Sequence, residues 1–151
     1  MDSPQAVILV SDQDLGHSDW LTITQEMITQ FGIVTLDADD PMHNDPEWAK
    51  DKGPFGTIVS YGFLTLSLLT CFSHQITKHE FLKYALNYGF DRVRIISPVP
   101  VDSRIRAHFV TGSVEERSDG GRKTTINVTI EIEGQEKPAL TAEWLSISYP
   151  S

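Results

Sequence analysis

The sequence predicts an α+β fold in which one long antiparallel sheet wraps around a central apolar helix. Residues 57–73 contain no charged side chain and are apolar on almost every side, whereas residues 87–150 alternate apolar and polar positions between turn residues. A helix that is apolar all round belongs inside a core, and an alternation of period two is typical of strands with one buried face. Helix and sheet would then bury each other's apolar surface.

Size and charge restrict the classes of function. A chain of 151 residues buries one core, so we expect residues 1–151 to form a single domain. With 12 basic and 21 acidic residues the net charge is −9, which disfavours binding to nucleic acid or to anionic membranes. Cys71 is the only cysteine, and the N-terminal residues lack the basic segment of a signal peptide, so we expect a cytoplasmic protein.

The first half of the chain should contain short elements. Residues 1–23 include the β-branched runs "AVILVSD" and "WLTIT", which predict an N-terminal arm or an edge strand. Thr24 is placed to cap a helix over residues 25–35, whose apolar residues recur at helical spacing. Asp45 can cap a helical turn that starts at Pro46 and ends near Gly53. The apolar residues 57–74 then predict the central helix.

The second half of the chain reads as an antiparallel meander. Its strands correspond to "LNYGFDRVRIISPVP", "SRIRAHFVTGSVEERS", "KTTINVTIEIEG" and "ALTAEWLSISYP" within residues 87–150. The intervening "SDGGRK" predicts a tight hairpin, because Asp-Gly and Gly-Gly accept positive φ angles. An open sheet leaves edge strands, and covering them with a second copy is a common solution, so we expect a homodimer.

Three segments carry a resemblance to a known family. "DPMHNDPEWA", "GPFGTIVSYGFLTLSLLT" and "FDRVRIISPVPVDSRIR", in this order, resemble the MaoC-like dehydratases, a hotdog-fold family that includes R-specific enoyl-CoA hydratases and the nodulation protein N group. The likeness runs from about Phe31 to Tyr149. It implies a hotdog domain that reversibly hydrates a trans-2-enoyl-CoA to an (R)-3-hydroxyacyl-CoA, with coenzyme A as part of the substrate and no other cofactor. The histidines outside the "DPMHNDPEWA" segment, His17, His74, His79 and His108, lack the spacing of metal ligands, so no metal is expected.

The expected reaction defines which groups are needed. Adding water across a conjugated thioester requires a base for the water proton, an acid for the α-carbon and a hydrogen-bond donor for the enolate oxygen. In the family, an Asp-x-Asn-Pro-x-His motif holds a carboxylate and an imidazole around one water. The resemblance places His43 at the imidazole, Asp40 at the asparagine, and Gly62 at the glycine whose backbone N–H faces the thioester oxygen.

The family's aspartate position is occupied by Ala38, and a methyl group neither holds a water nor delivers a proton. One interpretation is that the loop carries an extra residue, so that Asp37 takes the catalytic place with Leu36 filling the turn before it. The other is that the aspartate is lost and the chain is a slow or inactive hydratase that still binds acyl-CoA. Asp39 and Asp40 are fallback candidates for the acid.

Further residues are candidates for support or for the acyl pocket. Tyr61 stands where many members have histidine and is expected to line the pocket or to pack at a dimer interface, with Phe63 as a pocket residue. Ser67 corresponds to a serine that supports the catalytic histidine in some relatives, although a bond from its hydroxyl to a preceding helix carbonyl is an equally simple role.

Two other functions remain open from the sequence. A catalytically impaired acyl-CoA-binding subunit that pairs with an active homologue is favoured by Ala38. An acyl-CoA thioesterase is the third reading, since other hotdog families hydrolyse thioesters with a carboxylate on or near the central helix. The absence of an acidic residue from positions 57–73 counts against it.

Overall fold

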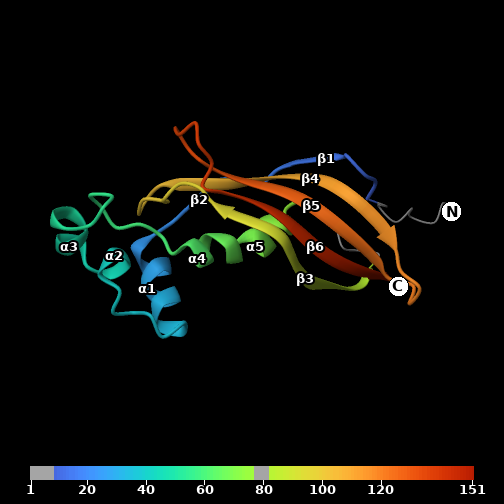
Figure 1. The fold of residues 1–151 in the computed structure, drawn as a ribbon, viewed down its shortest axis with the longest axis horizontal. Coiled ribbons are helices and arrows are strands. Elements are labelled where there is room, and N and C mark those ends of the chain that lie inside the picture. Colours follow the sequence, from blue (N-terminus) through green and yellow to red (C-terminus); the bar gives the residue numbers. More distant parts are fainter. Residues whose placement is uncertain (1–8, 77–81) are drawn as a thin grey trace.

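A six-stranded antiparallel sheet dominates the computed structural model, which describes residues 9–76 and 82–151 (Figure 1). The four long strands are β3 (Leu82–Ile95), β4 (Arg104–Glu116), β5 (Arg122–Ile132) and β6 (Leu140–Pro150). The two short strands, β1 (Asp14–His17) and β2 (Leu21–Thr22), both pair with β4. The predicted α+β fold with a long antiparallel sheet is confirmed.

The order of the strands is β1-β4-β5-β6-β3, with β2 also against β4. Strands β4, β5 and β6 form the expected meander, and Gly120, with φ of +86°, lies in the predicted hairpin turn. Strand β3, however, pairs with β6 instead of β4. The reason is that β1 and β2 already occupy the free edge of β4, so β3 completes the sheet on the opposite side and is left as an edge strand.

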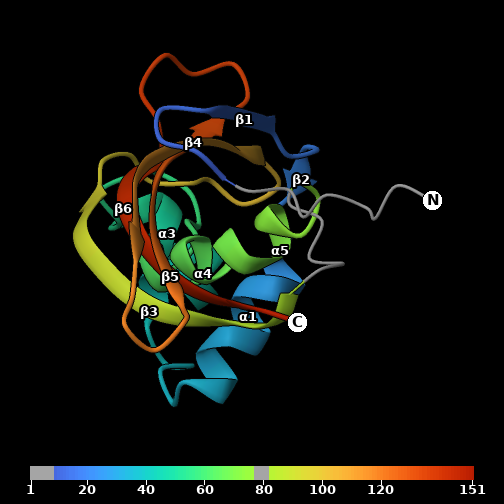
Figure 2. The same ribbon diagram turned by 90° about the vertical axis from the view of Figure 1, so that its right-hand side faces the viewer.

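The sheet curls around the helices α4 (Gly62–Ser67) and α5 (Leu69–Ser73), as Figure 2 shows end-on. Phe72 and Leu69 of α5 are almost completely buried. They face the inner side of the sheet. Along β4 and β5, buried residues that point to this side alternate with more exposed residues that point away from it. The largest fully buried side chains of these two strands are Ile105, Phe109, Thr111, Val128, Ile130 and Ile132.

The predicted central helix over residues 57–74 is wrong at its start and only partly buried. Residues 58–60 are extended, because Ser60 N–H donates to Val99 O and Val101 N–H donates to Ile58 O. Helical structure begins at Gly62 and changes from α4 to α5 at Leu68. The β-branched run before Gly62 therefore follows its strand propensity. One uncharged face of the two helices is exposed in the single chain; it consists of Phe63, Ser67, Thr70 and Cys71.

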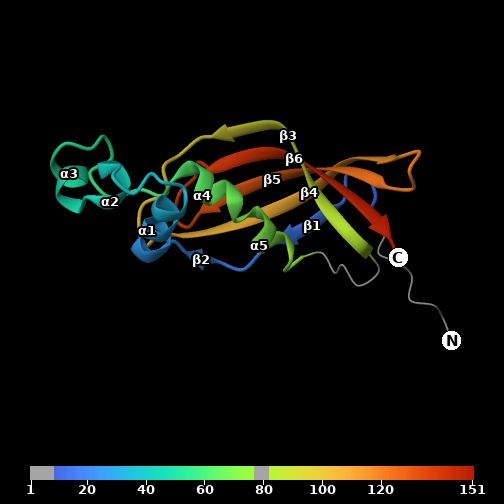
Figure 3. The same ribbon diagram turned by 90° about the horizontal axis from the view of Figure 1, so that it is seen from below.

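Three helices lie at one end of the sheet and precede α4 (Figure 3). They are α1 (Gln25–Val34), α2 (Pro41–Asn44) and α3 (Pro46–Asp51). As predicted, Thr24 caps α1 through its side chain and Asp45 caps α3. The predicted strand at "WLTIT" corresponds to β2. Of "AVILVSD", residues 6–8 lie outside the described residues, and residues 9–12 form no strand.

Candidate active site

The loop between α1 and α2 begins with an unusual turn at Leu36. This residue has a φ of +63°, in the left-handed region that favours glycine, and its side chain is 94% exposed. The N–H of Asp37 donates to Gly32 O at 2.8 Å and the N–H of Leu36 donates to Ile33 O, a pattern that closes the C-terminus of a helix. Leu36 thus occupies the turn immediately before Asp37.

Helix α2, which carries His43, is fixed by a carboxylate at its start. The Asp40 side chain accepts a hydrogen bond from Met42 N–H at 2.9 Å, and Pro41 occupies the first helical position. Both features are typical of helix N-termini. Asparagine serves as an N-cap as well as aspartate does, so the capping role needs no titrating group. Asp40 is therefore a structural support for the segment that holds His43.

Among the described residues, only the Nδ1 nitrogen of the His43 imidazole has a hydrogen-bond partner. Its Nδ1 lies 2.6 Å from the carbonyl oxygen of Val59, and a carbonyl only accepts hydrogen bonds, so Nδ1 carries the proton. In the neutral ring Nε2 is then unprotonated and acts as an acceptor. The backbone also holds this residue, because Gln25 Nε2 donates to His43 O at 2.9 Å. The fixed tautomer leaves Nε2 ready to accept a proton.

Tyr61 packs directly against this histidine. The two rings are stacked with centroids 3.8 Å apart, and the Tyr61 hydroxyl donates to Asp37 O at 2.7 Å and accepts from Asn44 Nδ2 at 3.0 Å. Burial raises the pKa of Tyr61, and the nearby carboxylates of Asp37 and Asp40 act in the same direction. Tyr61 is 7% exposed and is not among the residues that line the pocket described below.

The side chains of Asp37 and His43 are close to the same tyrosine but are not hydrogen-bonded to each other. Asp37 is exposed, and within residues 9–76 and 82–151 no carboxylate bonds to the His43 ring. Ala38 is also exposed and follows Asp37 in the same turn. The carboxylate of Asp37 is therefore open to solvent. Sequence reasoning missed Asn44 and the Val59 carbonyl, although the position of Asn44 next to His43 was a signal.

Gly62 begins helix α4 without a side-chain cap. Tyr61 is the N-cap residue and makes no capping bond through its side chain, so the first N–H groups of α4 have no intrahelical acceptor. A Cβ atom at Gly62 would lie 2.6 Å from Cδ1 of Ile95, an exposed side chain of β3 that would have to change its conformation to admit it. The backbone N–H of Gly62 is a donor of the kind that stabilises a developing oxyanion.

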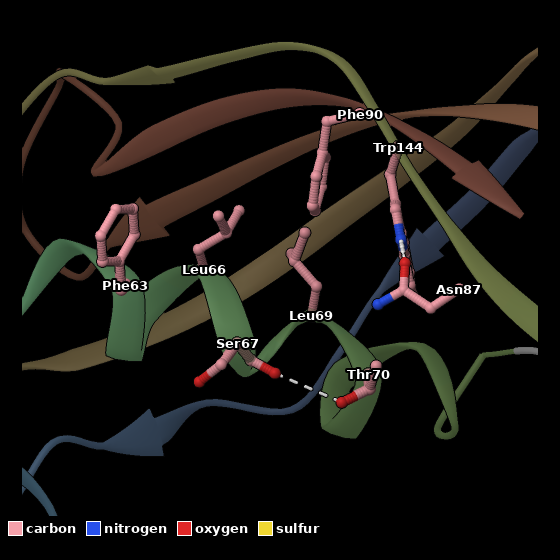
Figure 4. A pocket seen from close by; sticks show the side chains of 8 residues that line it. All are labelled: Phe63, Leu66, Ser67, Leu69, Thr70, Asn87, Phe90 and Trp144. Atoms are coloured by element: carbon pink, nitrogen blue, oxygen red, sulfur yellow. Dashed lines mark hydrogen bonds between the residues drawn. The ribbon is translucent and has the colours of Figure 1, made fainter. Parts of the chain in front are cut away.

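An apolar pocket lies between the two central helices and the strands β3 and β6 (Figure 4). Its volume is about 180 Å³, and it is lined by Phe63, Leu66, Ser67, Leu69, Thr70, Asn87, Phe90 and Trp144. Asn87 Oδ1 accepts a hydrogen bond from Trp144 Nε1 at 2.8 Å. The Ser67 hydroxyl donates to Leu64 O at 2.7 Å, so Ser67 is a pocket residue that bonds within its own helix and not to His43.

The described residues offer neither a metal-binding cluster nor a membrane-spanning helix. Among them, no group of three or more His, Cys, Asp and Glu side chains is arranged to hold a metal ion. None of the helices in this part of the chain has the length and apolarity needed to cross a membrane.

The sequence is similar to one protein family and to several named proteins over most of its length. Residues 9–134 match the family described as MaoC like domain. The 3-hydroxyacyl-thioester dehydratase Z of Mycobacterium tuberculosis is 44% identical over 131 residues, which cover 87% of this chain and 85% of the relative. Nodulation protein N of Rhizobium meliloti is 44% identical over 137 residues, which cover 90% of this chain and 84% of the relative.

The fold is similar to solved hydratase structures. An (R)-hydratase from A. caviae involved in PHA biosynthesis superposes with a TM-score of 0.74 at 20% sequence identity. The alignment covers 96% of this chain and 100% of the hydratase. At this identity the likeness concerns the fold, which is the hotdog arrangement expected from the sequence.

Proposed function

Because this chain belongs to the MaoC-like dehydratase family, which acts on acyl thioesters, we propose that it reversibly hydrates a trans-2-enoyl-CoA to an (R)-3-hydroxyacyl-CoA. The observation that carries the proposal is the fixed tautomer of His43, whose Nδ1–H is bound to Val59 O and whose Nε2 is left as a base. The name of the mycobacterial relative, a 3-hydroxyacyl-thioester dehydratase, supports the same reaction class.

The proposed mechanism uses one water molecule and no other reactant. Nε2 of His43 accepts a proton from the water as the water oxygen bonds to C3 of the enoyl group, while the Asp37 carboxylate holds the second hydrogen of the water. The electron pair of the double bond moves toward the thioester, and the backbone N–H of Gly62 stabilises the enolate oxygen. The imidazolium then delivers its proton to C2, which completes the addition of water. Dehydration follows the same steps in reverse.

The proposal assigns the apolar pocket to the acyl chain. The pocket lies along the helix that begins at Gly62, so a thioester held at Gly62 has an apolar surface beside it for the chain. Apolar walls with a few polar groups are typical of small-molecule sites. Phe63 and Leu66 are the pocket residues of α4 that would limit the chain length, together with Phe90 and Trp144 on the sheet side.

We also propose that the protein is a cytoplasmic homodimer in which β3 is covered by a second copy. Strand β3 is a long edge strand, and its exposed large apolar side chains include Tyr84, Leu86, Tyr88 and Ile95. Unpaired edges of this kind are normally covered or protected by charge. The uncharged face of α4 and α5 is also exposed in the single chain, with Phe63 at 73% exposure. A second copy that covers this face as well would bury it.

A second candidate function is an impaired subunit that binds acyl-CoA without turning it over. The observation in its favour is that Asp37 is exposed and makes no hydrogen bond to His43, while Ala38 occupies the family position. Such a subunit would retain the pocket and the Gly62 donor. It would pair with an active homologue to form a working enzyme.

Mass spectrometry of a crotonyl-CoA incubation separates these functions. Hydration adds the mass of one water to the thioester, hydrolysis releases free coenzyme A, and binding alone leaves the substrate unchanged. We expect the water adduct, and we expect His43→Ala to abolish it. The control is His17→Ala, which removes a histidine that stacks on His108 at the β1 edge of the sheet. Free coenzyme A, or an adduct that survives in His43→Ala, would contradict the proposal.

A further inference from the structure

Tyr61 is the point at which the three candidate catalytic residues meet. It directly precedes Gly62, its ring stacks on His43 with centroids 3.8 Å apart, and its hydroxyl bonds to the backbone carbonyl of Asp37 at 2.7 Å. The mechanism described above gives this tyrosine no chemical step. Its buried side chain nevertheless links the start of α4 to the loop that carries Asp37 and to helix α2, which carries His43.

The hydroxyl of Tyr61 is fully engaged on the loop side. It donates to Asp37 O and accepts from Asn44 Nδ2, and the amide of Asn44 in turn accepts from Thr29 Oγ1 at 3.3 Å. Asn44 directly follows His43 in the chain. The Tyr61 hydroxyl oxygen therefore bonds both to Asp37 and to the residue next to His43, the two groups proposed to share the water. The Tyr61 ring also contacts the ring of Phe31, which is tilted against it with centroids 5.1 Å apart.

Helix α1 leaves room for this hydroxyl by carrying a glycine. A Cβ atom on Gly32 would lie only 2.5 Å from the Tyr61 hydroxyl oxygen. The same atom would lie 3.2 Å from Ala38 Cα. Glycine is unfavourable inside a helix by roughly 0.5–1 kcal/mol relative to alanine. The close approach of the hydroxyl gives a physical reason for glycine at this position.

We propose that Tyr61 is a positioning residue of the hydration site, which holds Asp37 and His43 at the separation that one shared water requires. The inference rests on the proposed function and deepens it. It explains how Asp37, one position before the place of the family's aspartate at Ala38, can act as the catalytic carboxylate. On the extra-residue interpretation Asp37 lies one position before the family's place, and the bond from the Tyr61 hydroxyl to its carbonyl fixes the Asp37 backbone against the tyrosine that stacks on His43. Misplacement of a reacting group by about 1 Å lowers rates by up to roughly 100-fold.

Steady-state hydration of crotonyl-CoA by Tyr61→Phe tests the inference. Phenylalanine keeps the ring stack on His43 and loses only the hydroxyl, so we expect kcat to fall about 10-fold or more while KM changes by less than about 2-fold. The matched control is Tyr149→Phe, which loses a tyrosine hydroxyl bonded to Asp119 at 2.8 Å in a turn at the far end of the sheet. We expect this control to keep the kcat of the unchanged protein.

Gly32→Ala provides a second, independent variant. The added methyl group displaces the Tyr61 hydroxyl, so Gly32→Ala should lower kcat as Tyr61→Phe does, although alanine favours the helix. Because both changes break the same contact, the double variant should be no slower than the slower single variant by more than about 2-fold. Losses that multiply in the double variant would overturn the inference.

The outcomes separate this inference from the proposed function. If the unchanged protein adds no water to enoyl thioesters, the proposed function fails and the positioning role fails with it. If the unchanged protein is active and Tyr61→Phe keeps its kcat, only the positioning role is overturned. A fall in kcat that is accompanied by an equal rise in KM and a lower Tm would show a merely structural tyrosine and would also overturn it.

Discussion

Replacement of Leu36 by glycine should stabilise the protein, although it removes a large apolar side chain. Leu36 has a φ of +63°, and the left-handed conformation costs a residue with a Cβ atom about 1–2 kcal/mol. Glycine escapes this cost but loses about 0.5–1 kcal/mol through the greater freedom of the unfolded chain. The side chain is 94% exposed, so its removal forfeits almost no burial. The net gain lies between about 0 and 1.5 kcal/mol, and the middle value of about 0.75 kcal/mol corresponds to about 1.5–3 °C in Tm for a chain of this size.

Urea unfolding of Leu36→Gly and Leu36→Ala measures this effect. Alanine keeps the Cβ atom and therefore the backbone strain, so its free energy of unfolding should stay within about 0.5 kcal/mol of the unchanged protein. Only the glycine variant should gain stability. If both variants were destabilised by more than about 1 kcal/mol, the Leu36 side chain would be buried in solution and the reasoning from its exposure would be refuted.

The remaining predictions concern the cap of α2, the core and the buried tyrosine. Asp40→Ala should cost about 1 kcal/mol of stability, whereas Asp40→Asn should keep both stability and kcat because asparagine caps equally well; urea unfolding and crotonyl-CoA turnover check this pair. Phe72→Ala should lower the free energy of unfolding by about 3–5 kcal/mol, because Phe72 is 0% exposed in the core. Burial raises the pKa of Tyr61 above its ordinary value of 10.0, so the unfolded chain ionises first as pH rises. The stability that this shift contributes is therefore lost above about pH 10, and urea unfolding should show a smaller loss over the same range in Tyr61→Phe.

The parts of the fold that depend on local patterns were predicted from the sequence. The alternation over residues 87–150, the Asp-Gly-Gly turn and the Thr24 and Asp45 caps each correspond to an observed element. The start of the central helix was not predicted correctly, because the apolar content of residues 57–61 does not distinguish a buried helix from an extended segment. Its extended form depends on hydrogen bonds to residues 99 and 101, a partner that is remote in the sequence. The place of β3 beside β6 likewise depends on the edge that β1 and β2 occupy.

The candidate site shows the same division between local and remote information. His43 and Gly62 were selected by resemblance to a motif, and Leu36 was expected in the turn before Asp37. The residues that fix their geometry are remote from the motif in sequence, since Val59 sets the tautomer of His43 and Tyr61 bonds to the Asp37 carbonyl. A motif specifies which side chains take part. The contacts between segments determine how they are held.

The central claim is that Asp37 and His43 form the catalytic pair. The most direct test is the kcat for crotonyl-CoA hydration by the unchanged protein, by Asp37→Asn and by Asp39→Asn, which neutralises a neighbouring exposed acid as the matched control. The unchanged protein should turn over, Asp37→Asn should lose about 100-fold or more in kcat, and Asp39→Asn should keep its kcat within about 2-fold. The claim is contradicted if Asp37→Asn is as active as the unchanged protein, or if hydration appears only when Ala38→Asp restores the family's aspartate.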